Sequence, residues 1–242
     1  MSRQQSSRPA SVASARGEAL FSRVWAVLRL LVTALAIVAT VEQVRLAGQA
    51  AASAGIDPGF AVGRLFTFFT VLSNMTLIVV FGTAGIRALV RREDREPTWL
   101  AVLLASMSTY MLATGLVYNL VLRAVGDADI MGGWSNSVHH VIGPAFVLVD
   151  VLLAPRRRAL PWRAVLWVLG LPLAWVVFTL VTGPFRVATS TGTPPWYPYP
   201  FLDPATTGGY GGVALWVAGI AGLIAALAAA VIGVGRWRSR RP

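Results

Sequence analysis

Two adjacent histidines, His139 and His140, are the only histidines of the chain, and both lie within one long apolar run. Another apolar run carries the hydroxyl residues Thr70 and Ser73. A hydroxyl beside an imidazole is typical of nucleophilic acyl transfer, in which the imidazole takes the hydroxyl proton and a further donor stabilises the oxyanion. The spacing alone leaves open which hydroxyl and which histidine would react.

Further polar residues recur at helical spacing in the same runs. Thr70 and Asn74 are four residues apart, as are Asn136 and His140, so each pair would share one face of a helix. Asn74 and Asn136 are therefore candidates to orient the reacting groups or to donate to the oxyanion. Tyr118 in the intervening run is a further candidate polar partner.

The rise of a helix places the two reacting groups at comparable depth. Counted from Phe60, Thr70 lies about 15 Å along its run, and counted from Trp134, His140 lies about 9 Å along its own. Both positions fall in the outer half of a membrane. Asp150 lies near the inner end, where we expect it to pair with a group of arginines: Arg156, Arg157 and Arg158.

Several other chemistries are excluded by composition. The chain has no cysteine, so it forms no disulfide or thiolate metal site, and no lysine, so it forms no lysine Schiff base. Two adjacent histidines on one helix suit neither an ordinary zinc site nor bis-histidine haem. No HExxH, P-loop or G-x-S-x-G motif occurs. We therefore expect no metal and no cofactor.

The elements that would position these residues are membrane helices. The chain of 242 residues is 56% apolar and only 13% charged, with a mean hydropathy of +0.65. Its apolar runs are each close to the roughly 20 residues that span a bilayer. The sequence thus predicts an all-α polytopic membrane bundle of six helices. Residues 1–20 form a disordered basic arm, and a single domain covers residues 21–238. The runs fall at residues 24–45, 60–86, 98–122, 134–154, 164–182 and 213–235.

The arginines predict the topology. Four groups of four lie on alternate segments: the N-terminal arm (Arg3, Arg8, Arg16, Arg23), the second connection (Arg87, Arg91, Arg92, Arg95), the fourth (Arg156, Arg157, Arg158, Arg163) and the C-terminal tail (Arg236, Arg238, Arg240, Arg241). The opposite side has only Arg45, Arg64, Arg123 and Arg186. The positive-inside rule then places both termini in the cytoplasm. The net charge of +11 is thereby explained without nucleic acid. The arginine-only basic set indicates a GC-rich bacterial genome, and hence the bacterial inner membrane.

The last outer connection, residues 183–212, is long and rich in aromatic residues and proline. Its aromatic residues fit either of two interpretations. They form a belt at the membrane interface, or they form a lid over a site that opens outward.

Three segments together carry a family resemblance. These are Phe68-Phe69-Thr70-Val71-Leu72-Ser73-Asn74, then Asn136-x3-His140-x3-Pro144, then Trp196-Tyr197-Pro198-Tyr199-Pro200-Phe201-Leu202-Asp203. In this order, within a six-helix layout, they resemble the bacterial branch of the androgen-induced and androgen-dependent TFPI-regulating (FAR-type) multipass membrane family. The resemblance implies a hydrolase of fatty acid esters of hydroxy fatty acids. It also implies an intramembrane threonine matching Thr70 and a histidine matching His140.

The sequence therefore leads to one main hypothesis and two alternatives. The main hypothesis is a membrane lipid-ester hydrolase with Thr70 as nucleophile and His140 as base, acting on membrane lipids or lipid-like esters. The first alternative is a small transporter or lipid-binding scaffold, in which Arg64, Asp150 and the histidine pair line a polar path. The second is that the polar residues only join helices.

Overall fold

The computed structural model describes residues 8–91, 96–123, 133–155, 157–188 and 192–240, with side chains from residue 16 onward. This part of the chain is helical and contains no strand. Six helical spans are long and apolar enough to cross a membrane, at Arg16–Ser53, Phe69–Val90, Thr98–Leu122, Trp134–Leu153, Ala164–Phe185 and Tyr210–Arg238. The predicted six-helix membrane bundle is thus confirmed. The arginines Arg3, Arg92, Arg95, Arg156 and Arg241 lie outside the described residues.

The spans are built from long helices with short helical turns at their ends. The α-helices are α1 (Arg8–Ser53), α2 (Pro58–Leu65), α3 (Phe69–Val90), α4 (Thr98–Val117), α5 (Trp134–Ser137), α6 (Gly143–Leu153), α7 (Ala164–Thr182), α8 (Pro204–Thr207) and α9 (Tyr210–Arg238). Two π-helical turns, η1 (Tyr118–Leu122) and η4 (Val138–Ile142), extend α4 and join α5 to α6. The 3₁₀ turns η5 (Gly183–Phe185) and η6 (Pro200–Leu202) belong to the connection before α9.

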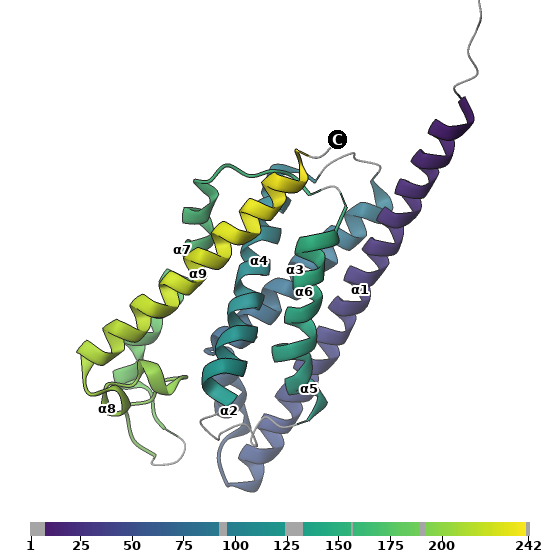
Figure 1. Cartoon of the computed structure of the whole chain (residues 1–242). Coiled ribbons are helices and arrows are strands. Elements are labelled where there is room, and N and C mark those ends of the chain that lie inside the picture. The colour runs from purple at the N-terminus through teal and green to yellow at the C-terminus, as the bar shows by residue number, and fades with distance from the viewer. Residues whose placement is uncertain (1–7, 92–95, 124–132, 156, 189–191, 241–242) are drawn as a thin grey trace, which may run out of the picture.

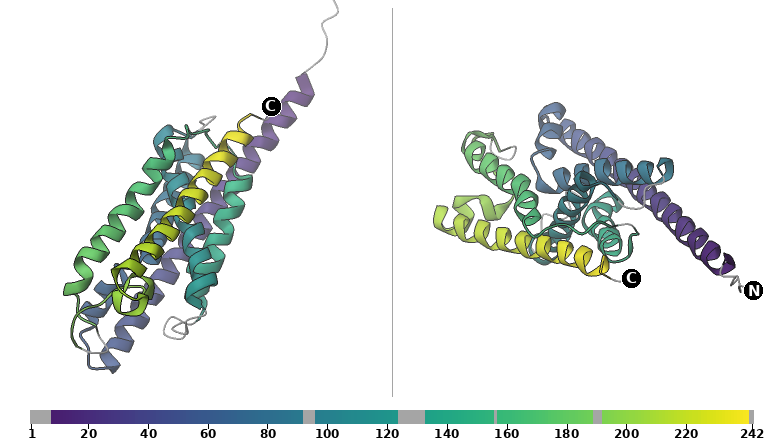
Figure 2. Two further views of the ribbon diagram at one scale, coloured as in Figure 1. Left: turned by 60° about the vertical axis from the view of Figure 1, so that its left-hand side comes forward. Right: turned by 90° about the horizontal axis from the view of Figure 1, so that it is seen from above.

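Helix α4 lies at the centre of the bundle. It packs against α3, α6, α7 and α9, with α1 beside α3 on one side and α7 beside α9 on the other (Figures 1 and 2). Large buried side chains such as Met107 and Met111 fill its surroundings. By contrast, α7 exposes Leu166 and Val181. An apolar exterior around a packed centre is the pattern expected of a bundle in lipid.

The two ends of the bundle are distinct. The start of α1 and the end of α9 lie at one end, which we call the terminal end, and α2, α5 and α8 lie at the other, which we call the loop end (Figure 1). The long aromatic connection between α7 and α9 covers part of the loop end.

Two elements differ from the sequence prediction. Residues 8–20, expected within a disordered arm, continue α1 as helix, and residues 1–7 lie outside the described part. The apolar run of residues 60–86 is not one helix, because the chain breaks between Leu65 and Phe69. There Phe68 is extended, with ψ of 134°. The break brings residue 70 into the first turn of α3.

Candidate active site

The break before α3 determines the state of the Thr70 hydroxyl. In a continuous membrane helix a threonine hydroxyl donates to a carbonyl three or four residues earlier. The structure shows this within α3 for Ser73 and Thr76, which donate to Phe69 and Ser73 respectively. Thr67, inside the break, donates to the Arg64 carbonyl. Before Thr70 the chain is not helical, and the Thr67 carbonyl accepts instead from the indole Nε1 of Trp175 at 2.9 Å. Thr70 therefore donates to no carbonyl of its own helix in the described part of the chain.

Instead, the Thr70 hydroxyl faces two side chains from distant parts of the sequence. Its Oγ1 lies 3.4 Å from Nε2 of His140 and 3.2 Å from Oη of Tyr199. The Tyr199 hydroxyl also accepts from the main-chain N–H of Thr70 at 3.2 Å. The predicted pairing of Thr70 with His140 is thus present in the structure, with Tyr199 as a third member.

The hydrogen bonds of His140 define its tautomer. Its Nδ1 lies 3.1 Å from the main-chain carbonyl oxygen of Asn136. Because a carbonyl only accepts, Nδ1 carries the ring proton, and the lone pair of Nε2 points at Thr70. The ring stacks on Tyr118 with centroids 3.8 Å apart, and Asn136 Nδ2 donates to the Tyr118 hydroxyl at 2.6 Å. Thus Asn136 and Tyr118, both candidates from sequence, orient the imidazole.

The second histidine is turned away from this site. His139 Nε2 lies 3.2 Å from the hydroxyl of Thr40 in α1. That hydroxyl already donates to the Ala36 carbonyl at 2.8 Å, so it accepts from His139, whose Nε2 carries the proton. His139 thus has the opposite tautomer to His140 and its Nε2 is not a base. Of the two histidines, His140 is therefore the one that faces the Thr70 hydroxyl.

The two remaining hydroxyl and amide candidates support α3 rather than point at the imidazole. Ser73 donates to the Phe69 carbonyl at 2.5 Å and contacts the Thr114 hydroxyl at 2.9 Å. Asn74 Nδ2 donates to the Thr70 carbonyl at 2.9 Å. Ser73 is therefore the weaker nucleophile candidate, and Asn74 fixes the backbone that carries Thr70.

Tyr199 is the site residue that sequence reasoning missed. It belongs to the long connection after α7. For the aromatic residues of this connection the sequence indicates only a belt at the membrane interface or a lid over the site. Its ring is buried and packs on Phe68, Trp175 and Phe201, with centroids 5.5, 5.9 and 5.1 Å away. Burial raises the pKa of the Tyr199 phenol, so the hydroxyl stays protonated and able to donate. The segment Tyr-Pro-Phe-Leu-Asp was the available signal, but nothing in it distinguishes an inward from an interfacial tyrosine.

An apolar cavity adjoins Thr70. It has an empty volume of about 780 Å³, including its part open to the outside, and lies among α4, α7, α9 and the aromatic connection. Thr70, Thr114, Tyr118 and Tyr199 supply hydroxyl groups to a wall that is otherwise mainly apolar. Val217 and Ile220 of α9 contribute to the apolar part. Such a cavity suits a hydrocarbon chain with a polar group near Thr70.

A second, surface groove lies next to this cavity. It runs between α4 and α9, and its lining shares Val117 and Ile220 with the cavity. Its other lining residues include the exposed Leu120 and Leu215, on the side that would face lipid. The groove is thus an apolar surface next to the cavity that Thr70 lines.

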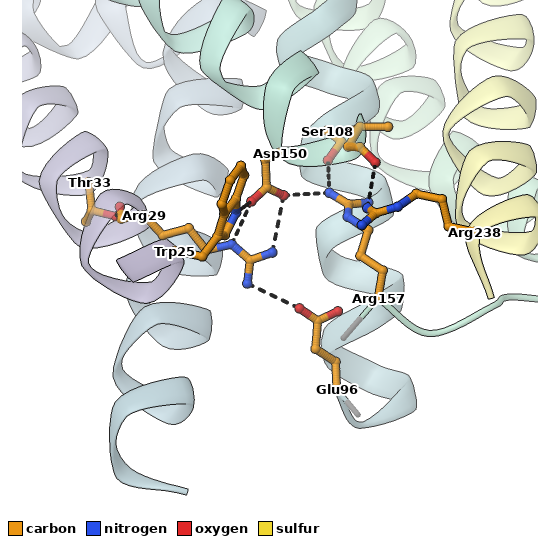
Figure 3. Close-up of polar contacts among 9 residues, drawn as sticks. Trp25, Arg29, Thr33, Glu96, Ser108, Asp150, Arg157 and Arg238 are labelled. Atoms are coloured by element: carbon orange, nitrogen blue, oxygen red, sulfur yellow. Dashed lines mark hydrogen bonds and ion pairs between the residues drawn. The ribbon is translucent and has the colours of Figure 1, made fainter. Parts of the chain in front are cut away.

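Asp150 belongs to a separate cluster at the terminal end (Figure 3). Its Oδ2 accepts from Arg157 Nη2 at 2.7 Å, which confirms the predicted pairing with the arginine group. Its Oδ1 accepts from Arg29 Nε at 2.8 Å and from Trp25 Nε1 at 2.7 Å. Arg29 Nη1 also reaches Glu96 at 3.2 Å. Two arginines and two carboxylates thus neutralise one another in a buried network. Arg29 was missed from sequence, although a charge inside an apolar run is itself a signal.

Apolar residues lie between the network and Thr70. On α3 they are Leu77 and Phe81, on α4 Met107 and Met111, and on α6 Val147, all fully buried in one cluster. Arg64 is also outside the Thr70 contacts, since its guanidinium lies over the Trp196 ring at 3.8 Å. Arg64 and Asp150 therefore do not meet the histidines in one polar path within the described residues.

No family model, curated protein or solved structure matches this chain. The family resemblance noted from the sequence therefore stays a prediction. Within the described residues no three His, Cys, Asp or Glu side chains gather closely enough to hold a metal ion.

Proposed function

We propose that the chain is an integral membrane lipid-ester hydrolase with Thr70 as nucleophile and His140 as general base. One observation carries the proposal. Within the described part of the chain, the Thr70 hydroxyl donates to no backbone carbonyl, faces the unprotonated Nε2 of His140, and lies on the wall of an apolar cavity. A distance of 3.4 Å is compatible with this role, since such contacts tighten when substrate binds.

The proposed reaction has two steps. Thr70 Oγ1 attacks the ester carbonyl while its proton passes to His140 Nε2, and the collapsing intermediate releases the alcohol, which takes that proton. A water molecule then gives its proton to His140 and attacks the acyl-threonine, releasing the fatty acid and returning the proton to Thr70. The Tyr199 hydroxyl, 3.2 Å from Oγ1, is the donor best placed to stabilise the oxyanion.

The topology predicted from the arginines gives this site a location. With both termini in the cytoplasm of a bacterial cell, the loop end faces outward from the inner membrane. An acyl chain would then enter from the outer leaflet through the groove between α4 and α9. Fatty acid esters of hydroxy fatty acids, the substrates that the family resemblance implies, fit an apolar cavity with one polar wall.

The transporter hypothesis has less support. A transport path needs polar groups in both halves of the bundle, and here the cluster of Leu77, Met107 and Val147 lies between the two polar regions. A lipid-binding scaffold would use the same cavity without turnover, so mutation of the nucleophile separates it from an enzyme.

The test compares matched pairs in purified protein. We expect Thr70→Ala and His140→Ala to abolish lipid-ester hydrolysis and labelling by a lipophilic fluorophosphonate. Their neighbours Ser73→Ala and His139→Ala serve as controls and should retain both when folded. We expect Tyr199→Phe to lower the turnover about 10²–10³-fold, as loss of an oxyanion donor does. Full activity in Thr70→Ala would refute the proposal.

A further inference from the structure

Two arginines lie near each other at the loop end, outside the catalytic contacts. Arg64 ends α2, and its guanidinium lies over the ring of Trp196, 3.8 Å from the centroid. Arg186 follows η5, and its guanidinium lies over Phe178 at 5.1 Å. Both side chains are half-buried. Burial and the positive charge of Arg186 lower the pKa of Arg64, which agrees with their proximity.

Neither arginine has an acidic partner among the described residues. Arg45, at the same end, differs, because it binds Glu42 at 2.7 Å and Gln49 at 2.8 Å. Two described aspartates of the neighbouring connections have other roles: Asp57 caps α2 through Phe60 N–H, and Asp203 caps α8 through Ala205 N–H. Two positive charges at one end of the bundle, with no carboxylate of the described residues bound to either, favour binding of an anion.

The same residues connect the arginine pair to the catalytic site. The main-chain N–H groups of Arg186 and Trp196 both donate to the Gly183 carbonyl, at 3.2 and 3.0 Å. Trp196 then packs edge-on against Phe68 at 5.8 Å, and Phe68 packs against Tyr199, whose hydroxyl contacts the nucleophile. The pair is therefore built into the wall that closes the loop end of the site.

We propose that Arg64 and Arg186 bind the phosphate of a membrane glycerophospholipid, which directs one of its acyl esters to Thr70. The second half of this statement rests on the proposed hydrolase function. Planar guanidinium groups match phosphate oxygens well, and a phosphodiester offers one free oxygen to each arginine. The pair lies where the membrane-spanning segments end, beside a tryptophan, as expected at headgroup depth.

A lipid-binding measurement tests the headgroup site without turnover. Fluorescent phosphatidylglycerol and diacylglycerol with identical acyl chains are titrated into purified protein in detergent. We expect wild type to prefer phosphatidylglycerol, and Arg64→Gln and Arg186→Gln each to bind it at least about tenfold more weakly. Arg45→Gln is the matched control and should bind as wild type does. Diacylglycerol binding should be the same in all four proteins, which also shows that the variants are folded.

Several results would overturn the proposal. Equal binding of the two lipids by wild type would show that the headgroup is not recognised. Tighter binding of a fatty acid ester of a hydroxy fatty acid, which has a free carboxylate, would assign the pair to the substrate that the family resemblance implies and not to a phospholipid. Displacement of the lipid by an equal concentration of inorganic phosphate would assign it to free phosphate. Because Thr70→Ala can be titrated in the same way, loss of headgroup recognition and loss of catalysis are measured separately.

Discussion

Replacement of Asp150 by asparagine should destabilise the protein strongly while leaving the Thr70 site intact. The carboxylate is fully buried and accepts four hydrogen bonds, one from Trp25, two from Arg29 and one from Arg157. The charges of the two arginines, of Asp150 and of Glu96 together sum to zero. Asp150→Asn leaves a net positive charge and directs amide hydrogens at guanidinium donors. Removing one partner of a buried ion pair costs about 3–5 kcal/mol, and we expect a loss in that range.

The measurement is the free energy of unfolding in mixed micelles, with a double-mutant cycle. Arg29→Met and Asp150→Leu are each expected to be destabilising, because each leaves a charge without its partner. The double variant removes one charge of each sign. Its loss of unfolding free energy should therefore be smaller than the sum of the two single losses by about 2 kcal/mol. Glu42→Gln, which breaks the exposed pair with Arg45, is the control and should change the stability very little.

Two results would refute this reasoning about the network. Asp150→Asn within about 1 kcal/mol of wild type would mean that water reaches the cluster, as at a protein surface. Strict additivity in the cycle would mean that Arg29 and Asp150 do not act as a pair. Fluorophosphonate labelling of the folded fraction of Asp150→Asn tests whether the Thr70 site stays intact. It should equal that of wild type, because the apolar cluster separates the network from Thr70.

Two further substitutions test how the loop end is held. Gly183→Ala would place a methyl group where the ring of Tyr197 lies, so we expect the aromatic connection to shift and ester hydrolysis to fall. Gly170→Ala, whose methyl group meets nothing within 4 Å, should keep its activity, and equal activity of the two variants would contradict this reasoning. Trp175→Phe removes the donor to the Thr67 carbonyl. This should lower the free energy of unfolding by about 1–3 kcal/mol in the same micelle assay. An unchanged value would show that another group satisfies this carbonyl.

Much of the architecture follows from residue types alone. Continuous apolar runs identify the spans. A carboxylate close in sequence to the arginines 156–158 predicts a pairing of Asp150 with this group, and the structure shows it with Arg157. The depth of Thr70 in the membrane, by contrast, does not follow from the sequence. The depth estimate assumed a straight helix from Phe60, and the chain instead breaks at residues 66–68. The estimate is therefore not valid, although the structure does bring Thr70 and His140 together.

The remaining features depend on contacts that have no local signal. The break before α3 contains no proline or glycine; Phe66, Thr67 and Phe68 are all compatible with helix, and the break is satisfied by Trp175 from another span. The inward position of Tyr199 likewise depends on rings contributed by α3 and α7. Sequence spacing reports which residues share a face, but not which helices become neighbours.

The geometry also explains why one hydroxyl among many would be reactive. Thr33, Thr40, Thr109 and Ser73 all donate to a carbonyl four residues earlier, so their protons are held by their own helices. A nucleophile needs its proton directed at a base. A helix that is interrupted just before the residue achieves this, because it removes the carbonyl that would otherwise accept the proton. In a membrane no water takes the place of that carbonyl. The break before Phe69 and the carbonyl-bound Nδ1 of His140 are then two parts of one arrangement. The first releases the hydroxyl of Thr70, and the second leaves a lone pair to receive its proton.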